Sequence, residues 1–381
     1  MLINKLSKES RTYYTDILRL IGSLSRLFSD SEIPYLNYRV TENLFCDAFN
    51  ASNESRTDCS ADAVKDKVGI GIKTFVNGNG RSFQKVAEFN SEAYKFRGKE
   101  SNEVVRIVSE MRNERIEFTK RLYNLDEIIY HCIVRDERKI SVFECNMNKI
   151  NIEKIKIQKV SKNSIHFKDD KDEYSINLSK STLYKRFITK DILESINVDI
   201  IQNPIELLTS KLSVPINIER VAEHERSYVV SNKEYIILPL FSDKGERHVP
   251  SKSSLNQWNA GGRKRNKDEA YISIPSWIHK KFPEFFPDRD KCFNLKLPDG
   301  QGIRAKVCQD GGKALMSNPN LDLGRWILRK VLNLNIGELL TYDRLESLGI
   351  DSVAITKEND LEYHIDFMKL GSYDNFLEDN N

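Results

Sequence analysis

The stretch Leu255–Asn266, with the sequence LNQWNAGGRKRN, gathers side chains that suit contact with a nucleic acid. The guanidinium groups of Arg263 and Arg265 can reach phosphates or guanine edges. The amides of Gln257 and Asn259 can hydrogen-bond to adenine, and two adjacent glycines would let the backbone approach a groove closely. We therefore interpret the stretch as a flexible arm for nucleic-acid contact. The alternative is a solvated basic loop between two strands.

A second candidate site lies earlier in the chain, where an aspartate precedes a strand that carries a lysine. In VGIGIKTFV, the two-residue period of a strand puts Gly71 and Lys73 on one face. Asp62 comes just before the preceding turn, so a hairpin would bring its carboxylate near Lys73. The alternatives are a solvated or ion-paired Lys73 and an Asp62 that only begins a turn. Asp58 competes with Asp62 for the same role.

Composition and charge bound the class of protein. The 381 residues are enough for two domains, or three, and 39% hydrophobic with 30% charged residues indicates a soluble globular chain. The net charge is only +3, so any affinity for nucleic acid must come from local clusters such as Arg263–Lys267 or Lys280–Lys281. The six cysteines form no C-x-x-C pair, which argues against a structural zinc site and a disulfide framework. With no secretory signal and no membrane-length apolar run, we expect a cytoplasmic protein.

Periodicity predicts the elements that would position these residues. Helical spacing predicts helices over 11–30, 41–51 and 100–125, and one or two within 318–346. Alternation predicts an antiparallel sheet over 127–177 and further strands at VGIGIKTFV, FQKVAEFN, YIILPLF, AYISIP, FNLKLP and IRAKVC. We place a domain boundary near residue 205, which divides the chain into 1–205 and 206–381.

An aspartate followed on the next strand by x-x-Lys resembles the skeleton of the PD-(D/E)XK nucleases. The resemblance implies that carboxylates hold Mg²⁺, which stabilises charge on the phosphate and lowers the pKa of the attacking water. It also implies that Lys73 orients that water or screens the phosphate, with assistance from Thr74. One position departs from the pattern, because Gly71 stands where the family has an Asp or Glu two residues before the lysine.

Glu42 is the best substitute for the missing carboxylate. It falls at the margin of the apolar face of the helix over 41–51, and PD-(D/E)XK enzymes commonly add an acid from the helix before the core hairpin. Asp62 and Glu42 are therefore the expected metal ligands. Glu88 and Gln84, on the following strand, are rivals, and Glu42 could instead only stabilise the first turn of its helix.

The C-terminal half resembles the DNA-recognition domain of NgoFVII-type type II restriction endonucleases. The resemblance covers roughly 234–376 and is carried by VPSKSSLNQWNAGGRKR, YISIPSWIHKKFPEFFP, AKVCQDGGKALMSNPN, LGRW and GELLTYDRLESLGIDSV. It implies the pseudobarrel of the plant B-three domains, in which two arms grip the major groove. The expected N-arm residues are Gln257, Trp258, Asn259, Arg263 and Arg265. The expected C-arm residues are Gln309, Lys313, Ser317, Asn318 and Asn320.

The N-terminal half departs from the NgoFVII type, which carries a phospholipase-D module with two H-x-K motifs. Here the one similar run, His166-Phe167-Lys168, is interpreted as part of a β-hairpin. We therefore expect an α+β protein, with a PD-(D/E)XK-like α/β nuclease domain at 1–205 and a B-three-like β-pseudobarrel at 206–381. The expected function is that of a type II restriction endonuclease that needs Mg²⁺ and acts on double-stranded DNA as a homodimer. The alternatives are a DNA-binding protein with an inactive nuclease core and a repair or nicking nuclease.

Overall fold

The computed structural model describes residues 1–54, 59–211, 234–242, 245–262 and 264–380. Contacts divide the chain into two compact units. The first comprises Met1–Ser55, Ser60–Ile116 and Leu125–Val229, and the second comprises Arg56–Cys59, Glu117–Asn124 and Val230–Asn381. The boundary that we expected near residue 205 stays a prediction.

The first unit contains a six-stranded sheet with the order β1-β2-β3-β5-β6-β11. Only β3 and β5 pair in parallel, and their register places Val68 opposite Glu127. The strands are β1 (Ser52–Asn53), β2 (Ala63–Lys65), β3 (Val68–Val76), β5 (Glu127–Asp136), β6 (Lys139–Asn146) and β11 (Glu194–Asn197). The strand predicted from VGIGIKTFV is thus confirmed over its whole length.

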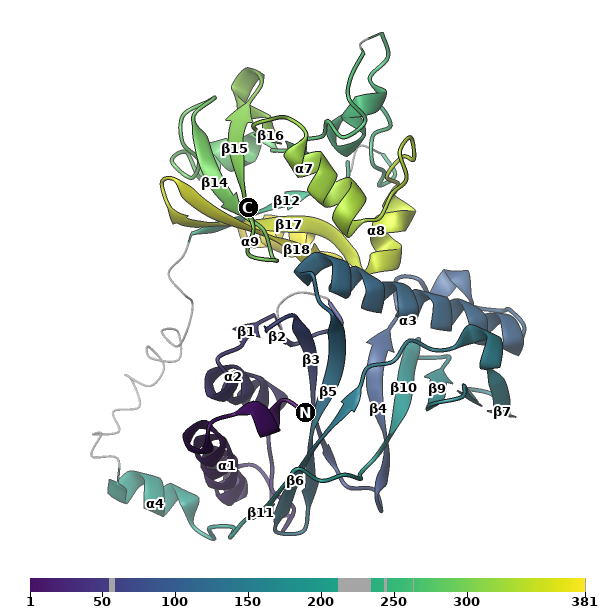
Figure 1. The fold of residues 1–381 in the computed structure, drawn as a ribbon, viewed down its shortest axis with the longest axis vertical. Helices are drawn as coiled ribbons and strands as arrows, with labels where there is room; N and C mark the ends of the chain where they lie inside the picture. The colour runs from purple at the N-terminus through teal and green to yellow at the C-terminus, as the bar shows by residue number, and fades with distance from the viewer. Residues whose placement is uncertain (55–58, 212–233, 243–244, 263, 381) are drawn as a thin grey trace. The chain divides into compact units, whose positions relative to one another are not determined.

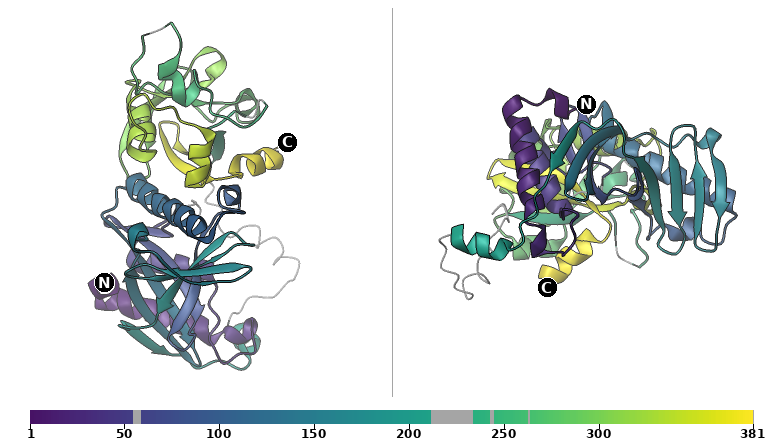
Figure 2. Two further views of the ribbon diagram at one scale, coloured as in Figure 1. Left: turned by 90° about the vertical axis from the view of Figure 1, so that its right-hand side faces the viewer. Right: turned by 90° about the horizontal axis from the view of Figure 1, so that it is seen from below.

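Two helices, α1 (Lys8–Ser23) and α2 (Tyr38–Phe49), cover one face of this sheet, as the purple ribbons in Figures 1 and 2 show. Ser7 caps α1 by accepting a hydrogen bond from the backbone N–H of Ser10, and Asn37 caps α2 in the same way. Apolar side chains of both helices pack against the sheet in one core, which includes Tyr14, Phe45, Phe49, Ile70 and Ile72. The two predicted N-terminal helices are confirmed, with their ends shifted by a few residues.

A second, fully antiparallel sheet in the first unit has the order β4-β10-β9-β8-β7. Its strands are β4 (Arg81–Glu88), β7 (Lys156–Val160), β8 (Ser164–Lys168), β9 (Glu173–Asn177) and β10 (Thr182–Ile188). Helix α3 (Ser101–Tyr123) buries Val105 and Val108 against this sheet. His166 and Lys168 lie in β8, which pairs with β7 and β9, so the β-hairpin interpretation of this run is confirmed. The unit also contains helix α4 (Pro204–Lys211).

The second unit is built on a seven-stranded sheet that curls into a nearly closed barrel. Its order is β12-β17-β18-β14-β15-β16-β13, and its two end strands, β12 and β13, contact each other. The strands are β12 (Tyr235–Pro239), β13 (Ile272–Ser273), β14 (Cys292–Lys296), β15 (Gly302–Cys308), β16 (Ala314–Ser317), β17 (Ile350–Asn359) and β18 (Glu362–Lys369). Short helices accompany it: α6 (Ser276–Lys281), α7 (Asp322–Gly324) with a π-helical turn at Arg325–Val331, α8 (Tyr342–Leu348) and α9 (Ser372–Asn380).

The chain therefore combines helices with sheets, and its C-terminal region is barrel-like, as expected. Trp326 is buried, with its ring centroid 5.6 Å from that of Phe367 on β18. Among the helices in the described ranges, none has the length and apolar character needed to span a membrane.

Candidate functional site

The carboxylate of Asp62, beside the β2–β3 hairpin, lies within electrostatic reach of Lys73 on β3. Asp62 donates its backbone N–H to the carbonyl of Ile70 at 2.8 Å, which extends the hairpin by one residue. Its side-chain Oδ2 atom accepts a hydrogen bond of 2.7 Å from the backbone N–H of Ile72. Burial raises the pKa of Asp62 above its ordinary value, although Lys73, the Ile72 N–H and Arg39 each act to lower it. The structure thus places the two predicted residues within electrostatic reach of each other, and their catalytic roles stay a prediction.

Glu42 lies in the same neighbourhood, on α2. It is buried, and its Oε2 atom forms an ion pair of 3.0 Å with Nη1 of Arg39, one turn earlier. Burial, followed by the charges of Glu54, Glu42 and Asp62, raises the pKa of the Cys46 thiol to about 12. These three carboxylates are therefore all within electrostatic reach of one thiol.

Two residues of this cluster were not predicted from the sequence. Glu54 donates its backbone N–H to the carbonyl of Asp62 at 2.9 Å, so it sits on the strand edge beside the hairpin. Arg39 holds Glu42 and also influences Asp62. The spacing of Arg39 and Glu42, three residues apart on a helix, is a signal that could have identified the pair.

The space beside Gly71, where the PD-(D/E)XK pattern places a carboxylate, is occupied by two side chains. A Cβ atom at Gly71 would lie 2.8 Å from Cε of Met147 and 3.2 Å from Cδ1 of Tyr130. Both neighbours are buried, so the space that a side chain would need is already filled. The departure from the pattern is therefore built into the packing of the sheet.

The residues present fit Mg²⁺ only as a site of few protein ligands. Magnesium is commonly held by one or two carboxylates, with waters and substrate phosphates completing its octahedron. Asp62 and Glu42 can supply such carboxylates, and burial of Asp62 leaves its charged form in need of a cation. Within the described ranges no group of three or more His, Cys, Asp or Glu side chains is arranged to hold a metal.

The rival residues occupy other surroundings. Glu88, on β4, is exposed and forms an ion pair of 2.9 Å with Lys85, which lowers the pKa of Glu88. Gln84 donates to the hydroxyl of Ser82 at 2.5 Å. Thr74 points to the opposite face of β3 from Lys73, and its hydroxyl has no hydrogen-bond partner within the described structure. Asp58 lies outside the described residues.

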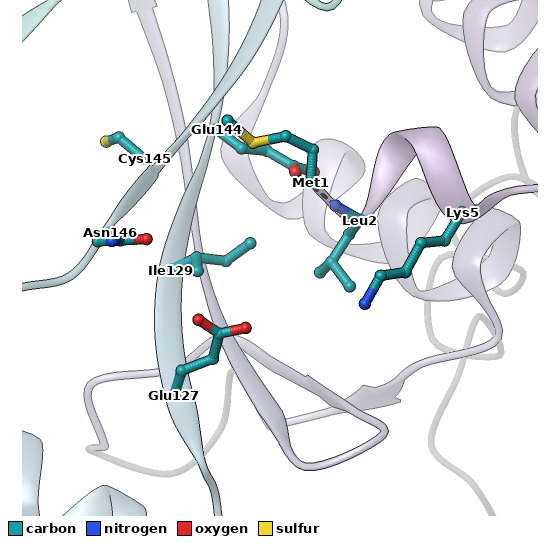
Figure 3. Close-up of a pocket in the computed structure, with 8 residues that line it drawn as sticks. All are labelled: Met1, Leu2, Lys5, Glu127, Ile129, Glu144, Cys145 and Asn146. Atoms are coloured by element: carbon teal, nitrogen blue, oxygen red, sulfur yellow. Dashed lines mark hydrogen bonds between the residues drawn. The ribbon is translucent and has the colours of Figure 1, made fainter.

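A separate polar cluster lies on the face of the sheet opposite Lys73. His131 pairs with Glu144 at 3.0 Å through Nδ1 and with the hydroxyl of Tyr14 at 2.8 Å through Nε2. Figure 3 shows Glu144 turned towards Leu2, whose N–H donates to it at 2.6 Å, beside a pocket of about 80 Å³. Burial acts to raise the pKa of Glu144, but His131 and the N–H groups of Leu2 and Ile3 outweigh it and lower the pKa. This cluster ties the N-terminal segment to the sheet.

Some residues of the predicted N-arm are buried and others are exposed. Gln257 is buried, and its Nε2 donates to Oε1 of Glu269 at 2.7 Å. Arg265 forms an ion pair of 2.7 Å with the same oxygen, so Glu269 contacts both Gln257 and Arg265. Asn259 is exposed, whereas the indole N–H of Trp258 is buried and, within the described structure, lacks a hydrogen-bond partner. Arg263 lies outside the described residues.

The predicted C-arm divides into two parts on either side of β16. Gln309 and Lys313 are exposed on the hairpin loop between β15 and β16, and Gln309 has a positive φ of 68°. Asn318 and Asn320 are exposed beyond the other end of β16. Ser317 is fully buried, and its hydroxyl accepts a hydrogen bond of 2.8 Å from the N–H of Leu323. That hydroxyl therefore caps the following helix and faces away from solvent.

The register of the barrel strands fixes where these parts lie. β13 pairs with β16 antiparallel, with Ile272 opposite Leu315 and Ser273 opposite Ala314. The N-arm enters β13 and thus lies at the Asn318 end of β16, while Lys313 lies at the other end. Lys313 and Asn318 are five residue steps apart along β16, or about 16 Å, somewhat more than the roughly 12 Å width of a DNA major groove.

Comparison with known proteins bears on this C-terminal region. Residues 219–359 match the family described as the NgoFVII C-terminal B3-like DNA-binding domain. A search of curated proteins gives no match. The matched segment contains the N-arm, the β15–β16 loop and Asn318–Asn320. The C-terminal region of this chain is therefore similar to a DNA-binding domain whose name derives from a restriction enzyme, which supports DNA as its partner.

Proposed function

We propose that this protein is a type II restriction endonuclease, in which the C-terminal barrel recognises a site on duplex DNA and the N-terminal unit hydrolyses a phosphodiester bond. The observation that carries the proposal is the hydrogen bond of 2.7 Å between Oδ2 of Asp62 and the N–H of Ile72. It fixes a carboxylate next to Lys73 in a chain that also contains the B3-like match.

Each residue of the N-terminal site has a role in this proposal. Asp62 and Glu42 would hold Mg²⁺, which when bound supplies positive charge to the phosphate and a more acidic water. Lys73 would contact a phosphate oxygen or the attacking water with its ammonium group. Arg39 would position Glu42 through their ion pair.

The C-terminal barrel would choose the site. Asn259 and Arg265 at one end of β16, with Asn318 and Asn320, would contact base edges and phosphates of one groove wall. Gln309 and Lys313 would contact the other wall. Since Gln257, Trp258 and Ser317 are wholly or partly buried, they would act mainly by shaping the two arms.

The test is incubation of the full-length protein with long unmethylated duplex DNA, in Mg²⁺ or in EDTA. Discrete fragments that form only with Mg²⁺ would support restriction. Because two strands must be cut, we also expect a homodimer on DNA, which sedimentation of the complex in EDTA would detect. Site-specific binding without cleavage in Mg²⁺ would refute the nuclease proposal.

One observation favours a second candidate, a DNA-binding protein that does not cleave. The position of the usual second carboxylate is Gly71, and the space beside it is filled by Met147 and Tyr130. In that case Asp62 would serve the hairpin alone. The two candidates differ in one measurable respect, since only a nuclease would bind DNA in EDTA and convert it to fragments in Mg²⁺.

A further inference from the structure

Helix α3 carries an arginine within its apolar face. Arg112 follows Val105, Val108 and Ser109 at helical spacing and precedes Ile116, and all four of these residues are buried. Arg112 itself is only 4% exposed. An arginine this deeply buried normally has a carboxylate or another anion as its partner, because an unpaired buried charge is costly.

The partners of Arg112 are two hydroxyl groups. Its Nη2 atom donates to the hydroxyl of Tyr130 at 2.8 Å, and its Nη1 atom donates to the hydroxyl of Ser60 at 3.1 Å. Burial raises the pKa of Tyr130, although Arg112 acts to lower it, so the phenol stays neutral at ordinary pH. Asp172, an acid of the adjoining strands, is already paired with Lys185. Within the described structure, therefore, no anion neutralises this guanidinium.

The guanidinium of Arg112 bonds to residues that neighbour the candidate cleavage site. Ser60 precedes Asp62 by two residues on the same segment. Tyr130 is opposite Gly71 in the β3–β5 register, and its ring fills the space beside Gly71. Lys73 lies two residues further along the same face of β3. Arg112 thus stands behind the position at which a PD-(D/E)XK site would have its second carboxylate.

The two ends of the guanidinium differ in access to solvent. Tyr130 is buried and holds Nη2 in the interior, whereas Ser60, the acceptor of Nη1, is only half-buried and precedes Asp62 by two residues. A ligand oxygen can replace a hydroxyl as the acceptor for Nη1 without disturbing the bond to Tyr130. A phosphate oxygen would also neutralise the charge, and arginine binds phosphate through parallel N–H groups.

We propose that Arg112 and Lys73 form an anion site for a phosphate group, in which a phosphate oxygen takes the place of the Ser60 hydroxyl on Arg112. This assignment rests on the proposed function only in naming the phosphate as that of DNA. The anion site itself requires no cleavage.

The test is thermal unfolding of the full-length protein in inorganic phosphate, compared with chloride at equal ionic strength. Phosphate at roughly ten times its dissociation constant should raise the Tm of the wild type by about 2–4 °C. Arg112→Met should lose this increment. Arg106→Met is the matched control, because Arg106 lies on the same helix but is exposed and pairs with Glu110. It should retain the increment.

A second pair of variants guards against misfolding of Arg112→Met. Arg112→Lys keeps the charge and should retain part of the phosphate increment, while Ser60→Ala removes the competing acceptor and should retain all of it or increase it. The proposal is overturned if phosphate does not stabilise the wild type, or if Arg112→Met responds to phosphate as the wild type does.

Cleavage of duplex DNA in Mg²⁺ separates this inference from the proposed function. If the wild type shows an Arg112-dependent response to phosphate but never cuts DNA, the anion site stands and the nuclease proposal fails. If Arg112→Met cuts DNA at the wild-type rate and phosphate has no effect on either protein, the nuclease proposal stands and the anion site fails.

Discussion

The Oδ2 atom of Asp62 accepts a hydrogen bond of 2.7 Å from the backbone N–H of Ile72, the residue before Lys73. A carboxylate in this position stabilises the hairpin but carries its charge into a partly desolvated environment. The raised pKa of Asp62 records that cost. The buried position of Asp62 therefore makes its charged form unfavourable in the fold, and in our proposal Mg²⁺ would offset that cost.

The first prediction concerns Asp62→Asn in EDTA. The folded-state pKa of this carboxyl is raised, so the folded protein binds more protons than the unfolded chain above the unfolded value of about 3.9. The stability of the wild type should fall as pH rises through the folded pKa, and Asn, which keeps an oxygen acceptor, should remove this dependence. Thermal unfolding from about pH 4 to about pH 7 should find the variant more stable at the upper end. If the Tm of Asp62→Asn at the upper pH were equal to or lower than that of the wild type, the charged Asp62 would not destabilise the fold, and the prediction would be wrong.

The second prediction concerns Gly71→Ala. A Cβ atom at this position meets the flexible end of Met147 and the ring of Tyr130, so the substitution should lower the free energy of unfolding by about 1 kcal/mol, at the low end of the cost of overpacking. Gly261→Ala is the matched control, because a Cβ there meets nothing within 4 Å. Urea unfolding of both variants measures the difference. A neutral Gly71→Ala would show that the space beside β3 is not filled.

The third prediction concerns the buried Glu144–His131 pair. Glu144→Ala should destabilise the protein by about 3–5 kcal/mol, because it leaves His131 and two backbone N–H groups without their acceptor. Since the pKa of Glu144 is lowered in the folded state, its contribution should be present above about pH 4.3 and be lost as pH falls through the folded pKa. Glu127→Ala, at an exposed position on the neighbouring strand, should change stability by less than about 0.5 kcal/mol. Equal effects of the two variants would refute this account.

The sequence predicts individual strands here better than it predicts which strands pair with each other. Alternation in VGIGIKTFV identifies β3 and the shared face of Gly71 and Lys73, because strand geometry is local. The parallel pairing of β3 with β5 joins residues more than fifty positions apart, and alternation carries no information about such a partner. Strand β17 was not predicted, because Asp351 and Ser352 are buried at its start and break the polar–apolar pattern.

In the candidate site, too, local structure places some residues and long-range packing places others. Asp62 and Lys73 are neighbours because they belong to one hairpin. The position of Arg112 depends instead on how α3 packs on the sheets. Its signal in the sequence is a cation at an apolar position of a helix. Gln257 has the chemistry of a base-reading residue, but its partner Glu269 lies twelve positions away and buries it.

The fourth prediction separates the two parts of the C-arm. Lys313→Ala should weaken DNA binding at all sequences and reduce the salt dependence of binding by about one charge, as expected for a phosphate contact. Ser317→Ala should lower the free energy of unfolding by about 1 kcal/mol through loss of its bond to the Leu323 N–H, with base preference unchanged. Fluorescence anisotropy in EDTA at several salt concentrations measures the binding of both variants. A change of base preference in Ser317→Ala would contradict its structural role.

The central claim is that cleavage occurs around Asp62 and Lys73, and single-turnover cleavage of duplex DNA in Mg²⁺ tests it most directly. Lys73→Ala should reduce the rate of cleavage by about 10²-fold or more while DNA binding in EDTA is retained. The control is Lys156→Ala, because Lys156 is also a strand lysine but is exposed on β7. It should cut at the wild-type rate. Wild-type rates in both variants, or cleavage by the wild type in EDTA, would contradict the account.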